Sequence, residues 1–289
     1  MELTYYCNGE FVKSSDLSVS LYDQAFLYGD GIYEPILVRD REIIFLEQHI
    51  GRFLQSAEIL GYNLNISEKV VKETVFALLD LNSLDDCMVK LIATRGDCSG
   101  YYYEDNYSYP VFIVIMLPPK YFPENIYFMG VSLKTSLLRD VPTYSMNHNI
   151  RALNMLNRRI NYYEAKKEGF FDALMINVEG YVTQCTGSNI FIINENTIIT
   201  PDLSCGVYPG VMRDYILDYV AKELNLDVYE GFVLAQNVIK AKECFIASTE
   251  IGVVPVISCD GNKIGSGRVG TITKSVQSYF IRWYKKRTI

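Results

Sequence analysis

The sequence predicts a mixed α+β fold in two parts, and three observations lead to this prediction. Short strand-like runs outnumber helical stretches, and both kinds occur in each half of the 289-residue chain. This pattern is typical of an α+β or mixed architecture and not of a doubly wound parallel sheet. The prolines of segment 117–123 interrupt all periodicity, because proline cannot continue a central strand or a helix interior. We therefore expect an interdomain linker at this point; an ordinary surface loop is the alternative.

In the first half, a hairpin precedes strands and helices. Asn8-Gly9 between apolar residues is a strong hairpin signal. Apolar residues at helical spacing end at Gly61, and Ser67 is a suitable N-cap for a further helix. The expected elements are helices over 46–60 and 67–79 and strands over 36–38, 89–93 and 111–116.

The second half repeats this mixture with more strands. Gly169 ends one helical pattern, and Pro209-Gly210 precedes another. Pro255 lies within a strand-like run, which we expect to be an edge strand if it is a strand at all. The expected elements are helices over 153–165, 211–224 and 269–284 and strands over 131–133, 173–178, 189–193, 197–200, 243–247 and 253–257.

Charge and composition exclude several classes of function. The formal net charge of −7 argues against a nucleic-acid surface, and the basic run 285–287 suits the end of a helix. No signal-peptide pattern and no apolar stretch long enough to cross a bilayer are found, so we expect a cytoplasmic protein without a membrane partner. The seven scattered cysteines predict free thiols, and with only two histidines a metal site is not expected.

Four blocks of sequence carry a family resemblance over nearly the whole chain. They are Tyr28-Gly29-Asp30-Gly31-Ile32-Tyr33-Glu34 with His49-Ile50-Gly51-Arg52-Phe53; Asn149-Ile150-Arg151-Ala152-Leu153-Asn154; the run 180–191 (GYVTQCTGSNIF); and Tyr208-Pro209-Gly210-Val211-Met212-Arg213 with Ser248-Thr249-Glu250. In this order and spacing they resemble the class IV aminotransferases, the fold-type IV PLP enzymes that include branched-chain and D-amino-acid aminotransferases and aminodeoxychorismate lyases.

The resemblance implies an architecture and an assembly. It implies a smaller N-terminal α/β domain over 1–119, a linker over 120–127 and a larger C-terminal pseudo-barrel α/β domain over 128–289, with the cofactor between the domains. It also implies a homodimer in which a loop of one subunit closes the site of the other.

The phosphate-binding residues of the family are retained. The turn before Val211 and Met212 places backbone N–H groups at a helix start, which is a ready anion site. The resemblance implies that this turn, Arg52 and Thr249 hold the PLP phosphate, and arginine suits this role because its planar fork pairs with phosphate oxygens. An exposed helix arginine is the alternative for Arg52. The full set of implied cofactor contacts is Arg52, Gln184, Tyr208, Val211, Met212, Ser248 and Thr249.

The catalytic residues of the family are altered. Relatives form an imine between PLP and a lysine at the position held here by Arg151, and arginine stays protonated at any ordinary pH, so it is a poor nucleophile and proton shuttle. Their Thr-Glu pair keeps the pyridine nitrogen protonated, whereas the pair here is Thr183-Gln184, and a neutral amide cannot do so. Covalent PLP catalysis is therefore not expected.

The substrate side also departs from the family. Thr94-Arg95-Gly96 lacks the arginine that follows it in D-amino-acid aminotransferases, and the run 101–103 of tyrosines is either a pocket lining or a surface hairpin. Tyr33 matches a position that faces the substrate; a buried strand tyrosine is the alternative. His148 is a candidate general base beside Arg151, against a loop histidine with no catalytic role.

Three functions remain open. The first is a protein that keeps the phosphate-binding residues and binds PLP, PMP or another small anionic metabolite non-covalently, or binds no cofactor. It would run a PLP-independent reaction with Arg151 as an electrostatic group. The second is an active PLP- or PMP-dependent aminotransferase or lyase-type enzyme. The third is a non-catalytic binding protein.

Overall fold

The computed structural model describes residues 2–103, 107–118 and 121–281, and the chain divides into two compact units. Unit 1 comprises Met1–Lys120 together with Asn149–Asn154, and unit 2 comprises Tyr121–His148 and Met155–Ile289. Segment 149–154 therefore belongs to unit 1, although it lies far along the chain from the rest of that unit.

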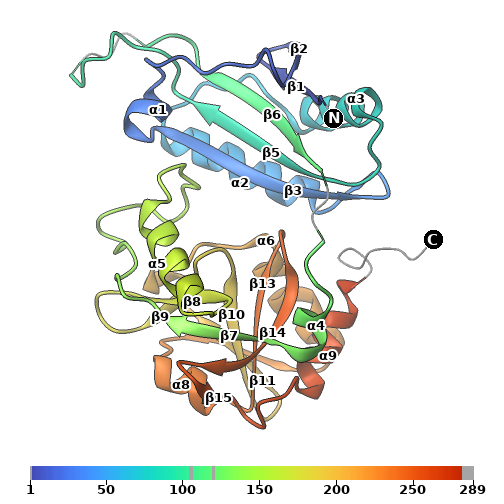
Figure 1. Cartoon of the computed structure of the whole chain (residues 1–289), viewed down its shortest axis with the longest axis vertical. Coiled ribbons are helices and arrows are strands. Elements are labelled where there is room, and N and C mark those ends of the chain that lie inside the picture. Colours follow the sequence, from blue (N-terminus) through green and yellow to red (C-terminus); the bar gives the residue numbers. More distant parts are fainter. Residues whose placement is uncertain (1, 104–106, 119–120, 282–289) are drawn as a thin grey trace. The chain divides into compact units, whose positions relative to one another are not determined.

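Unit 1 is an antiparallel sheet with helices packed on one face. In the described part of the chain its six strands run in the order β2-β1-β6-β5-β3-β4 (Figure 1). The strands are β1 (Thr4–Cys7), β2 (Glu10–Lys13), β3 (Gly31–Arg39), β4 (Glu42–Ile43), β5 (Cys87–Thr94) and β6 (Val111–Leu117). The helices are α1 (Gln24–Tyr28), α2 (Leu46–Ile59) and α3 (Glu68–Asn82).

Alternation along the strands separates the two faces of this sheet. Ile32 and Ile36 of β3 and Leu91 of β5 are fully buried in one hydrophobic core with residues of α2 and α3. Successive strand residues point to opposite faces. Tyr33 and Lys90, whose side chains are half-buried, consequently lie on the other face.

The short-range predictions for unit 1 are confirmed. Asn8 and Gly9, both with positive φ (45° and 102°), connect the β1–β2 hairpin. The hydroxyl of Ser67 accepts a hydrogen bond from the backbone N–H of Val70 and caps α3. Helix α2 ends close to Gly61, which adopts a φ of 70°.

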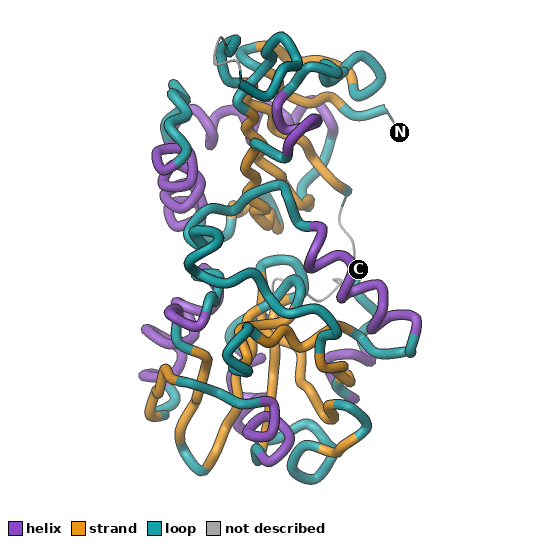
Figure 2. Tube along the Cα trace, turned by 90° about the vertical axis from the view of Figure 1, so that its left-hand side faces the viewer, coloured by secondary structure: helices purple, strands orange, loops and turns teal. Residues whose placement is uncertain are grey.

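Unit 2 is built around a larger mixed sheet. Within the described residues its path runs β12-β11-β10-β13-β14-β7-β8-β9, with β15 paired to β14, and Figure 2 shows these strands gathered at the centre of the unit with helices outside. The strands are β7 (Val131–Thr135), β8 (Asp172–Ile176), β9 (Val182–Cys185), β10 (Asn189–Asn194), β11 (Thr197–Pro201), β12 (Asp227–Gly231), β13 (Glu243–Ser248), β14 (Gly252–Cys259) and β15 (Asn262–Lys263). The helices are α4 (Asn125–Met129), α5 (Leu156–Lys167), α6 (Val211–Tyr215), α7 (Ala221–Glu223), α8 (Ala235–Lys240) and α9 (Thr271–Ser278).

Two helices predicted in unit 2 differ in detail from the structure. A 3₁₀ turn (η1, Leu203–Cys205) precedes α6, and a π-helical segment (η2, Ile216–Val220) joins α6 to α7, so 211–223 is one continuous helical stretch as predicted. Helix α9 is shorter than expected, and the predicted end of that helix at 282–284 lies outside the described residues. No helix in the described part of the chain is long and apolar enough to cross a membrane.

The prediction of an edge strand at Pro255 is wrong. Strand β14 lies in the interior of the sheet, between β13 and β7. The strand accommodates proline because β7 pairs with β14 only from Val256 onward, so Pro255 has a strand partner, Phe245, on one side alone. A missing N–H on the other side breaks no ladder bond.

Candidate functional site

Segment 149–154 is held against the first residues of β3 by backbone pairing. The N–H of Tyr33 donates to the carbonyl of Arg151 (3.0 Å), and the N–H of Leu153 donates to the carbonyl of Gly31 (2.8 Å). An antiparallel bridge joins Ile32 to Ala152 between them. The segment thereby places Arg151 directly opposite Tyr33.

A buried serine fixes the same segment from the helix side. Ser56 of α2 is fully buried, and its hydroxyl lies 3.1 Å from the carbonyl of Asn149 and accepts from the N–H of Arg151 at 3.2 Å. The backbone at 151 is thus held by both β3 and α2. Its side-chain direction is set by this pairing and not by a flexible loop.

Glycine at two positions permits this close approach. A Cβ at Gly31 would lie 2.6 Å from Leu153 Cδ1 and 2.9 Å from Ala25 Cβ, distances that real Cβ atoms do not show. Gly29 adopts a φ of 74° as the C-cap of α1, a conformation that suits glycine. The glycines of the Tyr28–Glu34 block therefore serve packing against segment 149–154.

The Arg151 side chain stacks on Tyr33. Its guanidinium carbon lies 4.8 Å from the centroid of the Tyr33 ring, within the range of a cation–π contact. The structure thus brings together two of the predicted catalytic residues, Arg151 and Tyr33. A guanidinium here is a permanent positive charge with several N–H donors and no acceptor.

A buried ionic cluster lies behind this pair. The carboxylate of Glu34 is fully buried, accepts from Arg52 Nε at 3.0 Å and lies 2.6 Å from His49 Nδ1. Burial by itself raises the pKa of Glu34, but Arg52, His49 and Arg151 outweigh it and lower that pKa to about 2. Burial lowers the pKa of His49, so a neutral imidazole donating its Nδ1–H to Glu34 fits the site.

Arg52 is a predicted phosphate contact, but in the structure its guanidinium pairs with a carboxylate. Its guanidinium is only 10% exposed and forms an ion pair with Glu34 inside unit 1. Val211, Met212, Ser248 and Thr249, its predicted partners at a phosphate, belong to unit 2. The Glu34–His49–Arg52 cluster was missed by sequence reasoning, although all three residues stand in the first block.

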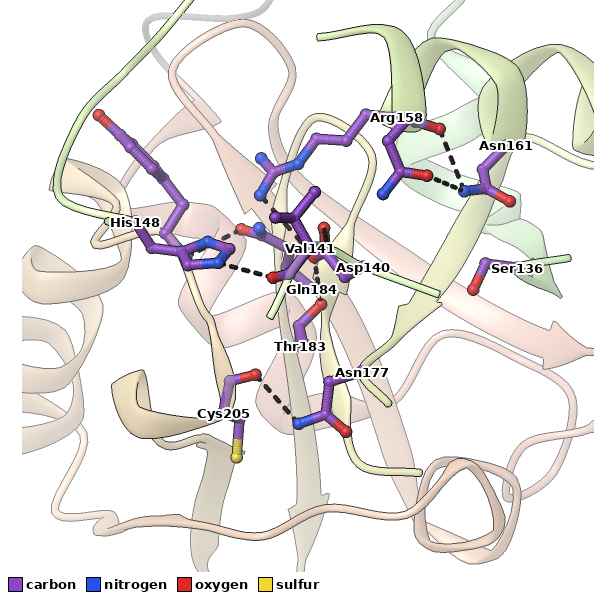
Figure 3. A network of polar contacts seen from close by, with 12 residues as sticks. Ser136, Asp140, Val141, His148, Arg158, Asn161, Asn177, Thr183, Gln184 and Cys205 are labelled. Atoms are coloured by element: carbon purple, nitrogen blue, oxygen red, sulfur yellow. Dashed lines mark hydrogen bonds and ion pairs between the residues drawn. The ribbon is translucent and has the colours of Figure 1, made fainter. Parts of the chain in front are cut away.

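In unit 2, polar contacts arrange the Thr183-Gln184 pair of β9 (Figure 3). The Thr183 hydroxyl donates to the buried carboxylate of Asp140 at 2.8 Å, and Arg158 lies 3.8 Å from the same oxygen. The backbone N–H of Tyr208 donates to Gln184 Oε1 at 3.3 Å. Gln184 and Tyr208, two predicted cofactor contacts, are therefore neighbours.

The amide of Gln184 is oriented with one donor unused. Its oxygen is engaged by Tyr208, whereas its buried Nε2 has no hydrogen-bond partner among the described residues. A buried amide N–H without an acceptor is costly, which is typical of a group that meets a ligand. The group that this amide can serve is an acceptor, such as an unprotonated ring nitrogen or a carbonyl.

His148 is placed in unit 2, three residues before Arg151 of unit 1. Its Nε2 lies 2.8 Å from the carbonyl of Val141, which accepts a hydrogen bond and so fixes Nε2 as the nitrogen that carries the hydrogen (Figure 3). Burial lowers its pKa. The imidazole is therefore neutral at pH 7 with Nδ1 as its acceptor, and its role as a general base stays a prediction.

The predicted phosphate turn has the backbone expected of an anion site. Gly210 is the N-cap of α6 in an extended conformation, and it provides no side chain to cap the N–H groups that follow. A Cβ at Gly210 would lie 2.0 Å from Asn189 Oδ1, so only glycine fits. Val211 and Met212 are buried, and Thr249, which follows β13, is 8% exposed. Helix α6 packs against β13, which brings the two parts of this predicted site into one region of unit 2.

No cluster of histidine, cysteine and acidic side chains suited to a metal ion occurs in the part of the chain that the structure describes.

Lys90 was not predicted as a site residue, because it is a single charge in an apolar strand. Its Nζ lies 4.7 Å from the centroid of the Tyr33 ring. Its signal in the sequence was the interruption of the run 87–94 (CMVKLIAT).

Comparison with known proteins gives consistent matches. Residues 31–259 match the family model described as amino-transferase class IV. The chain is 31% identical over 271 residues to the D-alanine aminotransferase of Bacillus licheniformis, covering 94% of this chain and 93% of the relative. It is 28% identical over 287 residues to the D-alanine aminotransferase of Staphylococcus aureus (strain MSSA476), with 98% and 99% covered.

Solved structures agree in fold. The branched-chain amino acid aminotransferase of Escherichia coli superimposes with a TM-score of 0.93 at 24% identity, over 98% of this chain and 95% of that chain. The branched-chain amino acid aminotransferase of Thermobaculum terrenum in its PLP form gives a TM-score of 0.87 at 21% identity, with 97% and 93% covered. The mixed α/β fold predicted from the sequence is thereby confirmed.

Proposed function

This chain belongs to the class IV aminotransferase family, and we propose that it binds PLP, PMP or another anionic metabolite non-covalently and has lost the covalent PLP catalysis of its relatives. The observation that carries this proposal is Arg151. The residue is fixed opposite Tyr33 by backbone hydrogen bonds. In the family resemblance this is the position of the lysine, so a guanidinium in place of an amine supports the proposal.

The residues of unit 2 fit a non-covalently held cofactor. The uncapped N–H groups at the start of α6 suit a phosphate, because a helix N-terminus favours negative charge. The unpartnered Nε2 of Gln184 suits a ring nitrogen that carries no proton. It does not suit a protonated ring nitrogen, since two donors would then face each other.

PLP, when bound, supplies an electron-withdrawing ring, whose strength depends on protonation of its nitrogen. Gln184 would donate to that nitrogen and leave it unprotonated, with its amide held in orientation by the N–H of Tyr208. Val211, Met212, Ser248 and Thr249 of unit 2 would hold the phosphate. Arg52 of unit 1 stays a predicted phosphate contact, although its guanidinium is paired with Glu34.

Arg151 would act through charge. Its guanidinium cannot release a proton near neutral pH, so it can neither form an imine nor shuttle a proton from a substrate carbon. It can hold an anionic group and stabilise negative charge that develops beside it. With Tyr33 it would orient a small metabolite. His148, three residues before Arg151 in the sequence, would be the candidate general base.

We further propose that the protein is a homodimer and that it is located in the cytoplasm.

The experiment is ligand binding followed by a test for covalent attachment. We expect PMP and PLP to raise the melting temperature, because a ligand at 100 times its Kd stabilises the native state by about 2.7 kcal/mol. We expect borohydride treatment of the PLP-loaded protein to leave no cofactor on the chain by mass spectrometry. Covalent label together with turnover of amino acids would contradict the proposal and favour an active aminotransferase. Absence of any thermal shift with PLP, PMP or inorganic phosphate would instead favour a protein without this ligand site.

A further inference from the structure

Segment 138–141 of unit 2 belongs to no helix or strand, and side chains of α5 hold its backbone. The buried Asn161 accepts a hydrogen bond from the N–H of Leu138 at 3.0 Å and donates to the carbonyl of the same residue at 3.2 Å. Asn157 donates to the carbonyl of Arg139 at 2.9 Å. Backbone N–H and C=O groups require partners, and these two asparagines supply what strand pairing supplies elsewhere. The segment is therefore a fixed part of the unit.

Asp140 is buried at the centre of this segment. One oxygen of its carboxylate accepts a hydrogen bond from the N–H of Val141 at 3.0 Å. The other oxygen accepts from the Thr183 hydroxyl at 2.8 Å, and Arg158 lies 3.8 Å from that oxygen (Figure 3). A buried carboxylate is stable only with donors and a nearby cation, and both oxygens of Asp140 are engaged in this way. The carboxylate thereby joins segment 138–141 to β9.

Each side of this contact supports a residue of the predicted site. Thr183 directly precedes Gln184 in β9, and neighbouring residues of a strand point to opposite faces. The hydrogen bond from Thr183 to Asp140 thus fixes the direction in which Gln184 projects. On the other side, the carbonyl of Val141 accepts a hydrogen bond from Nε2 of His148 at 2.8 Å. One carboxylate therefore supports both Gln184 and His148.

Asp140 also influences the charge of His148. Burial is the largest effect and lowers the pKa of His148, and Arg158 lowers it as well, whereas the Val141 carbonyl and the Asp140 carboxylate raise it. Within the described residues, Asp140 and Arg158 are the charged groups that act on this imidazole. The hydrogen bond to Val141 decides which ring nitrogen of the neutral histidine carries the hydrogen. Nδ1 is left as the acceptor.

We propose that Asp140 is a positioning residue of the site in unit 2, which orients Gln184 and fixes the tautomer of His148. It acts through Thr183 and Val141 and is not itself a ligand contact. A carboxylate suits this position because it offers two acceptor oxygens, whereas the amide of asparagine offers one and would turn its NH2 group toward another donor. The role rests on the proposed function, in which Gln184 and His148 meet the ligand.

The first test is NMR of the unliganded full chain, which has two histidines, and His148→Asn assigns the ring signal of His148. We expect the native imidazole, when neutral, to carry its hydrogen on Nε2. Asp140→Asn is expected to lower the pKa of His148, because Arg158 then acts without the opposing charge, and to mix the two tautomers. A pKa and a tautomer that stay unchanged in Asp140→Asn overturn the role at His148.

Arg158→Met tests the same role where Asp140→Asn is not folded. It removes the cation and keeps the carboxylate in place, so we expect the pKa of His148 to rise. Without that rise, the charge of the Asp140–Arg158 pair does not reach the imidazole, and the role at His148 is overturned.

The second test concerns Gln184 and uses Thr183→Val, which removes the hydroxyl and keeps the size of the side chain. We expect titration calorimetry to show PMP binding weakened roughly 2- to 10-fold, the range for one neutral hydrogen bond. Hydrogen exchange at the Tyr208 amide, which donates to Gln184, is expected to become faster. Thr183→Ser keeps the donor and is expected to restore both values. Native PMP affinity together with native exchange in Thr183→Val overturns the role at Gln184.

Asp260→Asn is the matched control in the same unit. Asp260 also accepts from a threonine, with the hydroxyl of Thr135 at 2.5 Å and its N–H at 2.8 Å, but Asp260 is exposed. The variant changes the net charge by the same amount as Asp140→Asn. We expect it to leave the pKa of His148 and the affinity for PMP unchanged.

Failure of this role and failure of the proposed function give different results. If PMP does not bind the native protein, the cofactor part of the proposed function fails, and the His148 signal and the Tyr208 exchange still decide the role of Asp140. If PMP binds Thr183→Val and Asp140→Asn as tightly as the native protein, the proposed function stands and the role of Asp140 is overturned.

Discussion

Two buried carboxylates show how surroundings decide the charge of a residue. Glu34 is surrounded by Arg52 and His49, and its pKa falls to about 2. Asp172 of β8 receives hydrogen bonds from the Thr186 hydroxyl (2.5 Å) and the N–H of Ala173 (2.7 Å), yet burial prevails and raises its pKa to about 6. Hydrogen bonds from neutral donors do not replace a cation when the charge is buried.

Glu34 is predicted to be more important for stability than Asp80, an exposed carboxylate of the same unit. Glu34→Gln leaves Arg52 largely buried without its carboxylate, and removing one partner of such a pair typically costs about 3–5 kcal/mol. Urea unfolding at pH 7 measures this loss. Asp80→Asn is the matched control. Asp80 also pairs with an arginine, Arg41, but its side chain is 69% exposed, so we expect no change in the free energy of unfolding. An equal effect of the two substitutions would contradict the structural role of the cluster.

The pH dependence of stability is predicted to contain two opposite contributions. Asp172 has a folded pKa of about 6 against an ordinary 3.8. Between those values the folded state holds a proton that the unfolded state has lost, so this group lowers stability by about 3 kcal/mol as pH rises from roughly 4 to 6. Glu34 has a folded pKa of about 2 against an ordinary 4.5, so its stabilisation is present above pH 4.5 and is lost as pH falls toward 2.

Asp172→Asn separates these contributions. We expect the variant to lose the slope between pH 4 and 6 while the decline below pH 4.5 persists. The free energy of unfolding, measured by urea denaturation at half-unit steps of pH, gives both slopes. A variant whose slope between pH 4 and 6 equals that of the native protein would show that Asp172 ionises normally.

Among the elements, those with strong local signals were predictable and segment 149–154 was not. Helices α2 and α3 have helical spacing and end signals at Gly61 and Ser67, and local rules suffice for them. Segment 149–154 is short and without periodicity, and it pairs with β3 more than 100 residues earlier, so only the tertiary fold defines it. Arg151 was found because its block matched a family; its convergence with Lys90 on Tyr33 depends on strand register, which one sequence does not fix.

Docking of this segment is predicted to depend on Gly31. Gly31→Ala introduces a Cβ that would lie 2.6 Å from Leu153 Cδ1, and overpacking of this kind costs about 1–3 kcal/mol. We expect faster hydrogen exchange at the amides of Leu153 and Tyr33, which form the pairing bonds. Gly51→Ala is the control: Gly51 lies in α2, and a Cβ added there would meet no atom within 4 Å, so alanine should stabilise the helix by about 1 kcal/mol. Unchanged exchange in Gly31→Ala would mean that the segment does not depend on close packing.

At the scale of the whole molecule, the two residues that we propose separate this chain from its relatives belong to different compact units. Arg151 belongs to unit 1, with Tyr33 and the Glu34 cluster, whereas Gln184 belongs to unit 2, with Tyr208 and the start of α6. Neither unit contains both residues. Substituting one position therefore tests one unit at a time, and substituting both tests whether the two residues act together.

We predict that the two substitutions are strongly non-additive. Arg151→Lys supplies an amine, and we expect borohydride to fix PLP onto the chain at residue 151 with little turnover, since Gln184 still leaves the ring nitrogen unprotonated. Gln184→Glu supplies the carboxylate but no amine, and we expect neither attachment nor turnover. The double variant would combine a lysine able to shuttle a proton, worth roughly 10²–10⁴-fold in rate, with a carboxylate able to keep the ring nitrogen protonated. Single-turnover kinetics over a panel of L- and D-amino acids, with mass spectrometry of the reduced protein, measures both properties. If the native chain turned over amino acids as fast as the double variant, Arg151 and Gln184 would not be the residues that separate this protein from its relatives.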